Sequence, residues 1–259
     1  LAHGLAERGH NVHVISQGLN GDGDHMDCKV NVHRIKHKDI FFHKWPFNEF
    51  SLRLEYSTAV FLKLMEVIKR YKIDIVEAPN LSGEGFLYGL FKKTPLVTRL
   101  HTHFSEAINF YGMRMSPDMR LSCFFENAAI RKSDLIICST KAHANLVAKE
   151  SGINLSSIKI IHLGIPMPGE DEITFAENKN PTVLFVGRIE KRKGPHILAK
   201  AIPIVIRHIP DAEFIFIGRD TFVSENNISI NGDNKHSFKK MILETIPEIY
   251  LNNVSFLGY

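Results

Sequence analysis

Short apolar runs alternate with segments of helical spacing along most of the chain. Runs of strand length lie at residues 11–16, 30–35, 73–78, 96–101, 134–139 and 158–163. Segments with apolar residues at every third or fourth position lie at residues 52–71, 84–93, 118–131 and 141–150. Parallel strands need a long crossover, usually a helix, between them. The alternation therefore predicts an α/β protein with a doubly wound parallel sheet.

The same alternation resumes after a polar stretch that contains proline and glycine. This stretch, residues 166–180, is typical of a linker between domains. We therefore expect a first domain at residues 1–165 and a second at residues 181–259. In the second series we expect strands at 182–187, 213–218 and 253–258, with helices at 195–208 and 236–244. Pro203 lies inside the first of these helices and is expected to kink or break it.

Composition narrows the class of protein. The chain of 259 residues is 44% hydrophobic and 23% charged, which is ordinary for a globular protein with two cores. Its three cysteines, Cys28, Cys123 and Cys138, form no Cys-x-x-Cys pair, so neither a disulfide framework nor a zinc knuckle is expected. No apolar run reaches the roughly 20 residues that cross a bilayer. These features predict a cytoplasmic protein, with the inner face of a membrane as a second possible location.

The formal net charge of +4 is compatible with phosphate-bearing ligands or an anionic membrane surface. It is too small to indicate nucleic acid as a partner without a basic stripe.

The strongest local signal is a basic turn between an apolar run and a helical segment. Residues 185–195 read Phe-Val-Gly-Arg-Ile-Glu-Lys-Arg-Lys-Gly-Pro. Gly187 permits a tight exit from the strand, Arg188 offers a planar fork for phosphate oxygens, and Lys193 adds a point charge before the helix. The pattern suits a diphosphate, although a solvated basic loop has the same composition. It matches neither a Walker loop nor a Gly-x-Gly-x-x-Gly turn.

Both ends of the sequence suggest a fragment. Residues 1–10 resemble the end of a helix, with Gly9 as its left-handed cap, and lead directly into a strand. The sequence stops at or just after another strand. We therefore expect that a strand precedes residue 1 and that more of the second domain follows residue 259.

Five motifs together resemble the retaining glycosyltransferases of family 4, which have the GT-B fold. In order they are Leu-Ala-Glu-Arg-Gly-His-Asn-Val-His-Val at 5–14, Pro-Leu-Val-Thr-Arg-Leu-His-Thr at 95–102, Ser-Asp-Leu-Ile-Ile-Cys-Ser at 133–139, His-Leu-Gly-Ile-Pro at 162–166, and Gly-Arg at 187–188 with Lys-Gly at 193–194. The resemblance covers nearly the whole chain. It implies two Rossmann-like domains, the first binding mainly an acceptor and the second a nucleotide-sugar donor, and a role in glycan biosynthesis.

The resemblance also implies roles for individual residues. In the family, the residues matching Arg188 and Lys193 bind the donor diphosphate, and the histidine matching His101 lies beside the transferred sugar. A retaining hexosyltransferase is implied, using a UDP- or GDP-linked sugar with no resident cofactor and no metal. The acceptor would be a sugar, a lipid-linked molecule or another small molecule. Gly218 and Arg219, at the end of a later strand, are expected near the nucleotide base.

Two family motifs are absent from the sequence. The glycine-rich loop after the first strand would lie before Leu1, and the Glu-x7-Glu motif that contacts the donor sugar and ribose would lie beyond Tyr259. Because orientation of the anomeric carbon depends on such contacts, residues 1–259 alone are expected to be inactive.

Two other functions remain open from the sequence. His101 and His103 alternate at a strand end and could supply two ligands of a metal-dependent hydrolase, with His162 as a further candidate ligand. A nucleotide-sugar-binding or epimerase protein on the same fold would keep the phosphate turn without the transfer. Residues 36–47 mix aromatic and basic side chains and suit peripheral membrane contact, an acceptor pocket or packing on their own domain.

Overall fold

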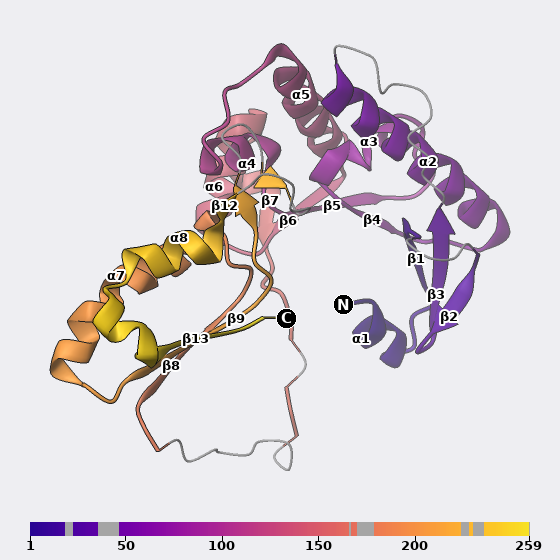
Figure 1. The fold of residues 1–259 in the computed structure, drawn as a ribbon. Coiled ribbons are helices and arrows are strands. Elements are labelled where there is room, and N and C mark those ends of the chain that lie inside the picture. Colours follow the sequence, from indigo (N-terminus) through magenta and orange to yellow (C-terminus); the bar gives the residue numbers. More distant parts are fainter. Residues whose placement is uncertain are drawn as a thin grey trace. The chain divides into compact units, whose positions relative to one another are not determined.

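The computed structural model describes residues 1–18, 23–35, 47–165, 167–169, 179–223, 228–229 and 236–258. Apart from Phe47, the aromatic and basic segment at 36–47 lies outside the described residues. The chain divides into two compact units, coloured along the sequence in Figure 1. The first comprises residues 1–107 and 114–166, and the second comprises residues 108–113 and 167–259.

The first unit contains two sheets built largely of parallel strands. In one sheet β1 pairs in parallel with β3, and β2 adds an antiparallel edge in the order β1-β3-β2. The other sheet is parallel throughout, in the order β4-β5-β6-β7. The six expected strands are present, whereas the short β2 was not expected. The strands are β1 (Val12–Gln17), β2 (His25–Asp27), β3 (Val30–Ile35), β4 (Val76–Pro79), β5 (Leu96–Leu100), β6 (Leu135–Cys138) and β7 (Ile158–Ile160).

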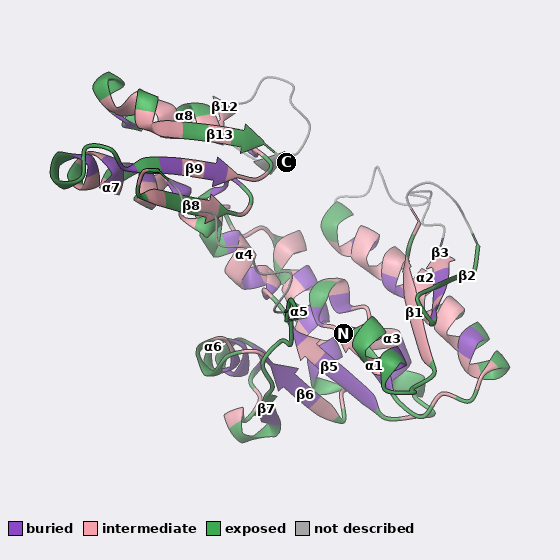
Figure 2. Cartoon of the chain, turned by 90° about the horizontal axis from the view of Figure 1, so that it is seen from below, coloured by how far each residue is buried: buried purple, intermediate pink, exposed green. Residues whose placement is uncertain are grey.

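Helices connect and cover these strands. Side-chain caps define two helix starts, because Ser116 Oγ accepts from the Met119 N–H and Thr140 Oγ1 accepts from the His143 N–H. Figure 2 shows β5 and β6 mostly buried, as expected for inner strands of a covered parallel sheet. The helices are α1 (Ala2–Glu7), α2 (Asn48–Arg70), α3 (Phe86–Phe91), α4 (Phe104–Phe110), α5 (Pro117–Arg131) and α6 (Lys141–Ser151), with 3₁₀ turns η1 (Leu81–Gly83) and η2 (Leu155–Ser157). The last three residues of α4 are assigned to the second unit.

The second unit has a parallel sheet in the order β13-β9-β8 and a small antiparallel sheet in the order β11-β10-β12. Its expected strands and helices are all present. The strands are β8 (Thr182–Val186), β9 (Glu213–Ile217), β10 (Phe222–Val223), β11 (Ile228–Ser229), β12 (His236–Ser237) and β13 (Val254–Gly258). The helices are α7 (Pro195–His208) and α8 (Phe238–Thr245), with 3₁₀ turns η4 (Lys191–Lys193) and η5 (Glu248–Asn253).

Helix α7 continues through Pro203, so the expected break is absent. Proline in a helix interior typically costs about 3 kcal/mol. Here the helix also buries an apolar face, formed by Ala199, Ile202 and Ile206, in the same core as Phe214 and Phe216 of β9. Burial of this face offsets the missing backbone hydrogen bond. Across the described residues, no helix is long and apolar enough to cross a membrane.

A histidine pair, with His33 buried and His13 half-buried, joins β1, β3 and α2. The rings of His13 and His33 stack with centroids 5.3 Å apart, and His13 Nδ1 lies 3.0 Å from His33 Nε2. His33 Nδ1 lies 2.8 Å from Asp24 Oδ2, and the other carboxylate oxygen lies 3.4 Å from Lys63 Nζ on α2. Burial and the neighbouring His33 lower the pKa of His13, and the His33 contact lowers the pKa of Asp24.

These pKa directions predict that acid destabilises the first unit. Above the ordinary histidine pKa of about 6.5, His13 is neutral in both the folded and the unfolded state. Protonation of His13 therefore takes no stability from the folded state in that pH range. As the pH falls below that value, the unfolded state takes up the proton first and the folded state loses stability. Denaturant unfolding between about pH 5 and pH 7.5 should show a smaller pH dependence for His13→Asn than for the native chain. The exposed His10→Asn is the control, and equal pH dependence in all three proteins would contradict the assignment.

Candidate functional site

Three glycines lie at the carboxyl ends of the neighbouring strands β8, β9 and β13. The Gly187 N–H donates to the Ile217 carbonyl at 2.9 Å, and the Gly218 N–H donates to the Gly258 carbonyl at 2.7 Å. A Cβ atom on Gly218 would lie only 1.9 Å from the Gly187 carbonyl oxygen. Glycine is therefore required at position 218 for the strand ends to approach this closely, at the edge where parallel α/β sheets bind ligands.

A buried carboxylate organises the basic turn that follows Gly187. Glu190 is 2% exposed, and its Oε1 lies 3.1 Å from one guanidinium nitrogen of Arg188 and 3.1 Å from one of Arg192. Tyr111, from the segment of residues 108–113 that belongs to this unit, donates to the other Glu190 oxygen at 3.4 Å. The side chain of Arg188 remains 50% exposed. Glu190 thus orients Arg188 while leaving other guanidinium donors available to an anion.

The end of this turn carries Lys193 to the start of α7. Lys193 is the last residue of η4, and Gly194 adopts a left-handed conformation with φ of 78° before Pro195 opens the helix. Lys193 is exposed and has no ion pair among the described residues. Its charge and the positive end of the helix dipole both favour an anion here. As the sequence predicts, the turn joins the end of a strand to the start of a helix and carries its cations there.

An open hollow of about 460 Å³ lies at the same strand edge. Asp220 lies at its border, accepting from Ser237 Oγ at 2.6 Å and from the Lys239 N–H at 3.0 Å, which fixes the start of α8. Lys239 Nζ lies 5.1 Å from the centre of the Phe256 ring. Gly218 and Arg219 line this hollow. The sequence places both residues at the end of a strand. The lining residues are Ile189, Gly218, Arg219, Asp220, Lys239, Phe256, Leu257 and Gly258.

In the first unit, His101 follows the carboxyl end of β5 and is exposed. Its backbone N–H donates to Asn80 Oδ1 at 2.6 Å, and Asn80 Nδ2 in turn donates to Glu126 Oε1. The other Glu126 oxygen accepts from the Phe104 N–H at 2.9 Å. Asn80 and Glu126 are almost completely buried, and burial raises the pKa of Glu126 while His103 opposes that shift. This network clamps both ends of the loop that carries His101.

His103 does not share the environment of His101. Its ring is completely buried, with Nδ1 at 2.7 Å from Ser105 Oγ and Nε2 at 2.9 Å from Asn127 Oδ1. Both ring nitrogens are therefore engaged within the fold, whereas His101 faces solvent. The alternation that suggested two metal ligands does not hold because the strand ends at Leu100 and the chain turns into α4.

Sequence reasoning did not single out Glu106 and His143, which lie near His101. His143 Nε2, at the start of α6, is 3.4 Å from Glu106 Oε2 on α4. Burial lowers the pKa of His143, Glu106 acts in the opposite direction, and His103 and His101 lower it further. α4 has only seven residues, too few for a clear periodic signal, so only the fold brings this pair to the end of β5.

The two units are α/β domains with parallel sheets, and each presents charged or polar groups at the carboxyl end of its strands. The model of glycosyltransferase family 4 matches residues 1–167, and the model of glycosyl transferases group 1 matches residues 169–259. The chain belongs to glycosyltransferase family 4 and has the GT-B fold.

The chain is also similar to individual proteins. The chain is 25% identical over 220 residues to an uncharacterized glycosyltransferase of Haemophilus influenzae, covering 84% of this chain and 56% of that protein. It is 38% identical over 77 residues to spore coat protein SA of Bacillus subtilis, covering 30% and 18%. Sucrose-phosphate synthase from Thermosynechococcus elongatus has the same fold, with a TM-score of 0.66, 17% identity and coverage of 99% and 62%. The chain thus spans roughly half the length of the Haemophilus relative.

The contact between Gly187 and Gly218 generates a stability prediction. Gly218→Ala should destabilise the second unit by about 2 kcal/mol or more, because the new methyl group overlaps a backbone oxygen that cannot move without breaking strand pairing. Gly164→Ala is the control, since nothing lies within 4 Å of the added atom. Denaturant midpoints would measure the difference, and equal midpoints for the two variants would show that the strand ends are not this close.

Proposed function

We propose that the enzyme to which this chain belongs transfers a sugar from a nucleoside-diphosphate donor to an acceptor hydroxyl, with retention of anomeric configuration. The observation that carries the proposal is the turn at residues 187–194. It carries four cationic side chains, two of which pair with one buried carboxylate, at a strand edge and before a helix start. That combination is suited to two adjacent phosphates.

The donor would lie along the carboxyl edge of the second unit. Arg188 and Lys193 would bind the diphosphate, and Gly187 would allow the backbone to approach it. The hollow beside Arg219 would receive the nucleoside. There Asp220 would accept hydrogen bonds from hydroxyl or amino groups of the ribose or the base. A UDP- or GDP-linked sugar satisfies this arrangement, and the donor would be a substrate with no resident cofactor.

The reaction would break the bond between the anomeric carbon and the diphosphate oxygen and form a bond to the acceptor oxygen. The nucleoside diphosphate leaves with the bonding electron pair, and the acceptor hydroxyl gives its proton to the departing diphosphate or to solvent. Negative charge grows on the leaving diphosphate in the transition state, so fixed cations stabilise that state more than the ground state. Arg188, already oriented by Glu190, would need little rearrangement to do so.

His101 would contact the transferred sugar from the first unit. Its backbone is held by Asn80 and Glu126, and its exposed ring is available for hydrogen bonds to sugar hydroxyls. Glu106 and His143 lie near His101 and would help to position it beside the sugar. The acceptor could be a sugar, a lipid-linked molecule or another small molecule. A transferase would release nucleoside diphosphate only when the acceptor is present, which would distinguish it from an epimerase or a simple binding protein.

The donor assignment predicts weaker nucleotide binding when a turn cation is removed. Arg188→Ala and Lys193→Ala should each weaken UDP or GDP binding roughly 10- to 100-fold, as expected for loss of a charge-assisted phosphate contact of about 1.5–3 kcal/mol. Arg207→Ala and Lys200→Ala, at exposed positions on α7, are charge-matched controls. Calorimetric titration of the chain would measure the affinities. Equal affinities for turn variants and controls would remove the diphosphate assignment.

The sugar-side assignment predicts a different kinetic effect. In the complete gene product, His101→Ala should lower kcat more than it weakens donor binding, because the contact is proposed for the sugar and not for the phosphates. Steady-state assays over a panel of nucleotide sugars, combined with donor titration, would separate the two effects. A loss confined to donor affinity, with kcat unchanged, would contradict this role.

A further inference from the structure

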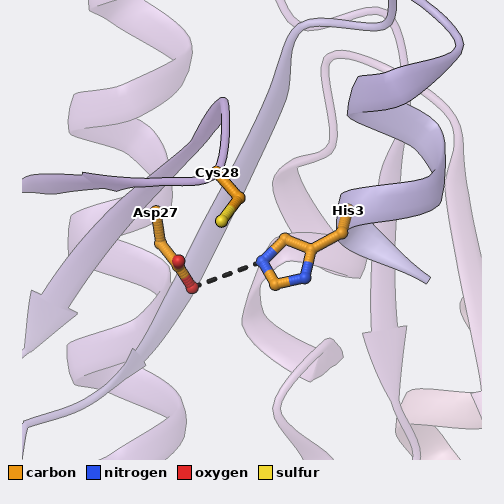
Figure 3. Close-up of side chains that lie close together, drawn as sticks. All are labelled: His3, Asp27 and Cys28. Atoms are coloured by element: carbon orange, nitrogen blue, oxygen red, sulfur yellow. Dashed lines mark hydrogen bonds and ion pairs between the residues drawn. The ribbon is translucent and has the colours of Figure 1, made fainter.

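Three potential metal ligands of different chemistry meet on the surface of the first unit. They are His3 on α1, and Asp27 and Cys28 at the turn between β2 and β3 (Figure 3). One nitrogen of His3, one oxygen of Asp27 and the Cys28 sulfur all lie within 4.8 Å of one another. His3 Nε2 is 3.3 Å from Asp27 Oδ2, and all three residues are exposed.

A hydrophobic core fixes the backbones that carry these ligands. Ala6 of α1 is buried with Val30 and Val32 of β3, and Ala2 packs against the same cluster. β2 is held to β3 by antiparallel pairing, in which Asp27 lies opposite Val30. The helix and the hairpin are thus positioned by packing that does not involve the three ligands.

We propose that His3, Asp27 and Cys28 form a binding site for a divalent metal ion of the zinc class. A thiolate, an imidazole and a carboxylate are the ligands that Zn²⁺ uses, whereas Mg²⁺ and Ca²⁺ prefer oxygen ligands alone. Tetrahedral zinc bonds of about 2.0–2.3 Å separate the ligand atoms by roughly 3.3–3.8 Å. Small side-chain rotations bring the three atoms within that range.

Binding would exchange one set of contacts for another. The Cys28 thiol would release its proton to solvent, and the hydrogen bond between His3 and Asp27 would be replaced by a metal bond to each. Solvent would complete the coordination. The ion would link α1 to a hairpin that lies 24 positions further along the chain, so it would hold the helix against the β1-β3 sheet. The site belongs to the first unit and shares no residue with the basic turn at residues 187–194, and this proposal is independent of the proposed transferase activity.

The test uses the chain after chelation, kept reduced, with Zn²⁺ and Co²⁺ as probes. Titration of Zn²⁺ against a chromophoric chelator should show one equivalent bound, and Co²⁺ should give the ultraviolet charge-transfer band of a thiolate ligand. Cys28→Ser should abolish that band, and His3→Ala and Asp27→Asn should each weaken Zn²⁺ binding at least 10-fold. His25→Ala, an exposed histidine on β2 outside the cluster, is the matched control.

A second measurement concerns the link between the elements. Hydrogen exchange of α1 amides should slow when Zn²⁺ is added to the native chain and to His25→Ala, and should not change in Cys28→Ser. Because all three ligands are exposed, these variants should fold, and circular dichroism would verify it. Absence of stoichiometric Zn²⁺ binding, or equal binding by Cys28→Ser and the native chain, would overturn the proposal. Equal weakening by His25→Ala would do the same, by showing diffuse surface binding.

Discussion

The backbone contact between Gly187 and Gly218 is the constraint on which the carboxyl edge of the second unit's sheet depends. Parallel strands of the second unit end side by side, and the carbonyl of Gly187 occupies the space where a side chain at position 218 would lie. This close approach lets the chain after β8 and the chain after β9 continue to pair, through the Ile189 N–H and the Arg219 carbonyl at 2.9 Å. The basic turn and the hollow therefore share one rigid strand edge.

Buried glutamates position the exposed candidate groups in both units. Glu190 forms ion pairs with two guanidinium groups. Glu126 accepts hydrogen bonds from the side chain of Asn80 and from the Phe104 N–H. A carboxylate in such a site needs its hydrogen-bond and ion-pair partners, because leaving it unpaired would cost several kcal/mol. The loops that supply these partners are held in place as a result. The side chain of Arg188 is thus oriented by Glu190, and the backbone of His101 is held by Asn80 and Glu126.

Charge and burial are distributed differently in the two units. The second unit concentrates exposed cations near a helix start, which suits a ligand with fixed negative charge. The first unit instead places neutral and titratable groups near the end of β5, including His101 and the pair of Glu106 and His143. Such groups suit hydroxyl-rich partners, which are recognised by hydrogen bonds and not by net charge. The contrast agrees with the proposed division between diphosphate and sugar contacts.

Local patterns in the sequence were sufficient to predict the longer strands and most longer helices, the parallel sheets and the basic turn before α7, but not β2, α4 or the small sheet β11-β10-β12. The predicted features follow from hydrophobic periodicity and from glycine and proline positions, which act over a few residues. The tertiary structure alone decided that Glu190 pairs with Arg188 and Arg192, that Asn80 and Glu126 hold the loop of His101, and that His103 is buried while His101 is exposed. It alone brought His3 to Asp27 and Cys28, and Glu106 to His143. Each of these contacts joins side chains whose proximity depends on packing between elements, which no local pattern encodes.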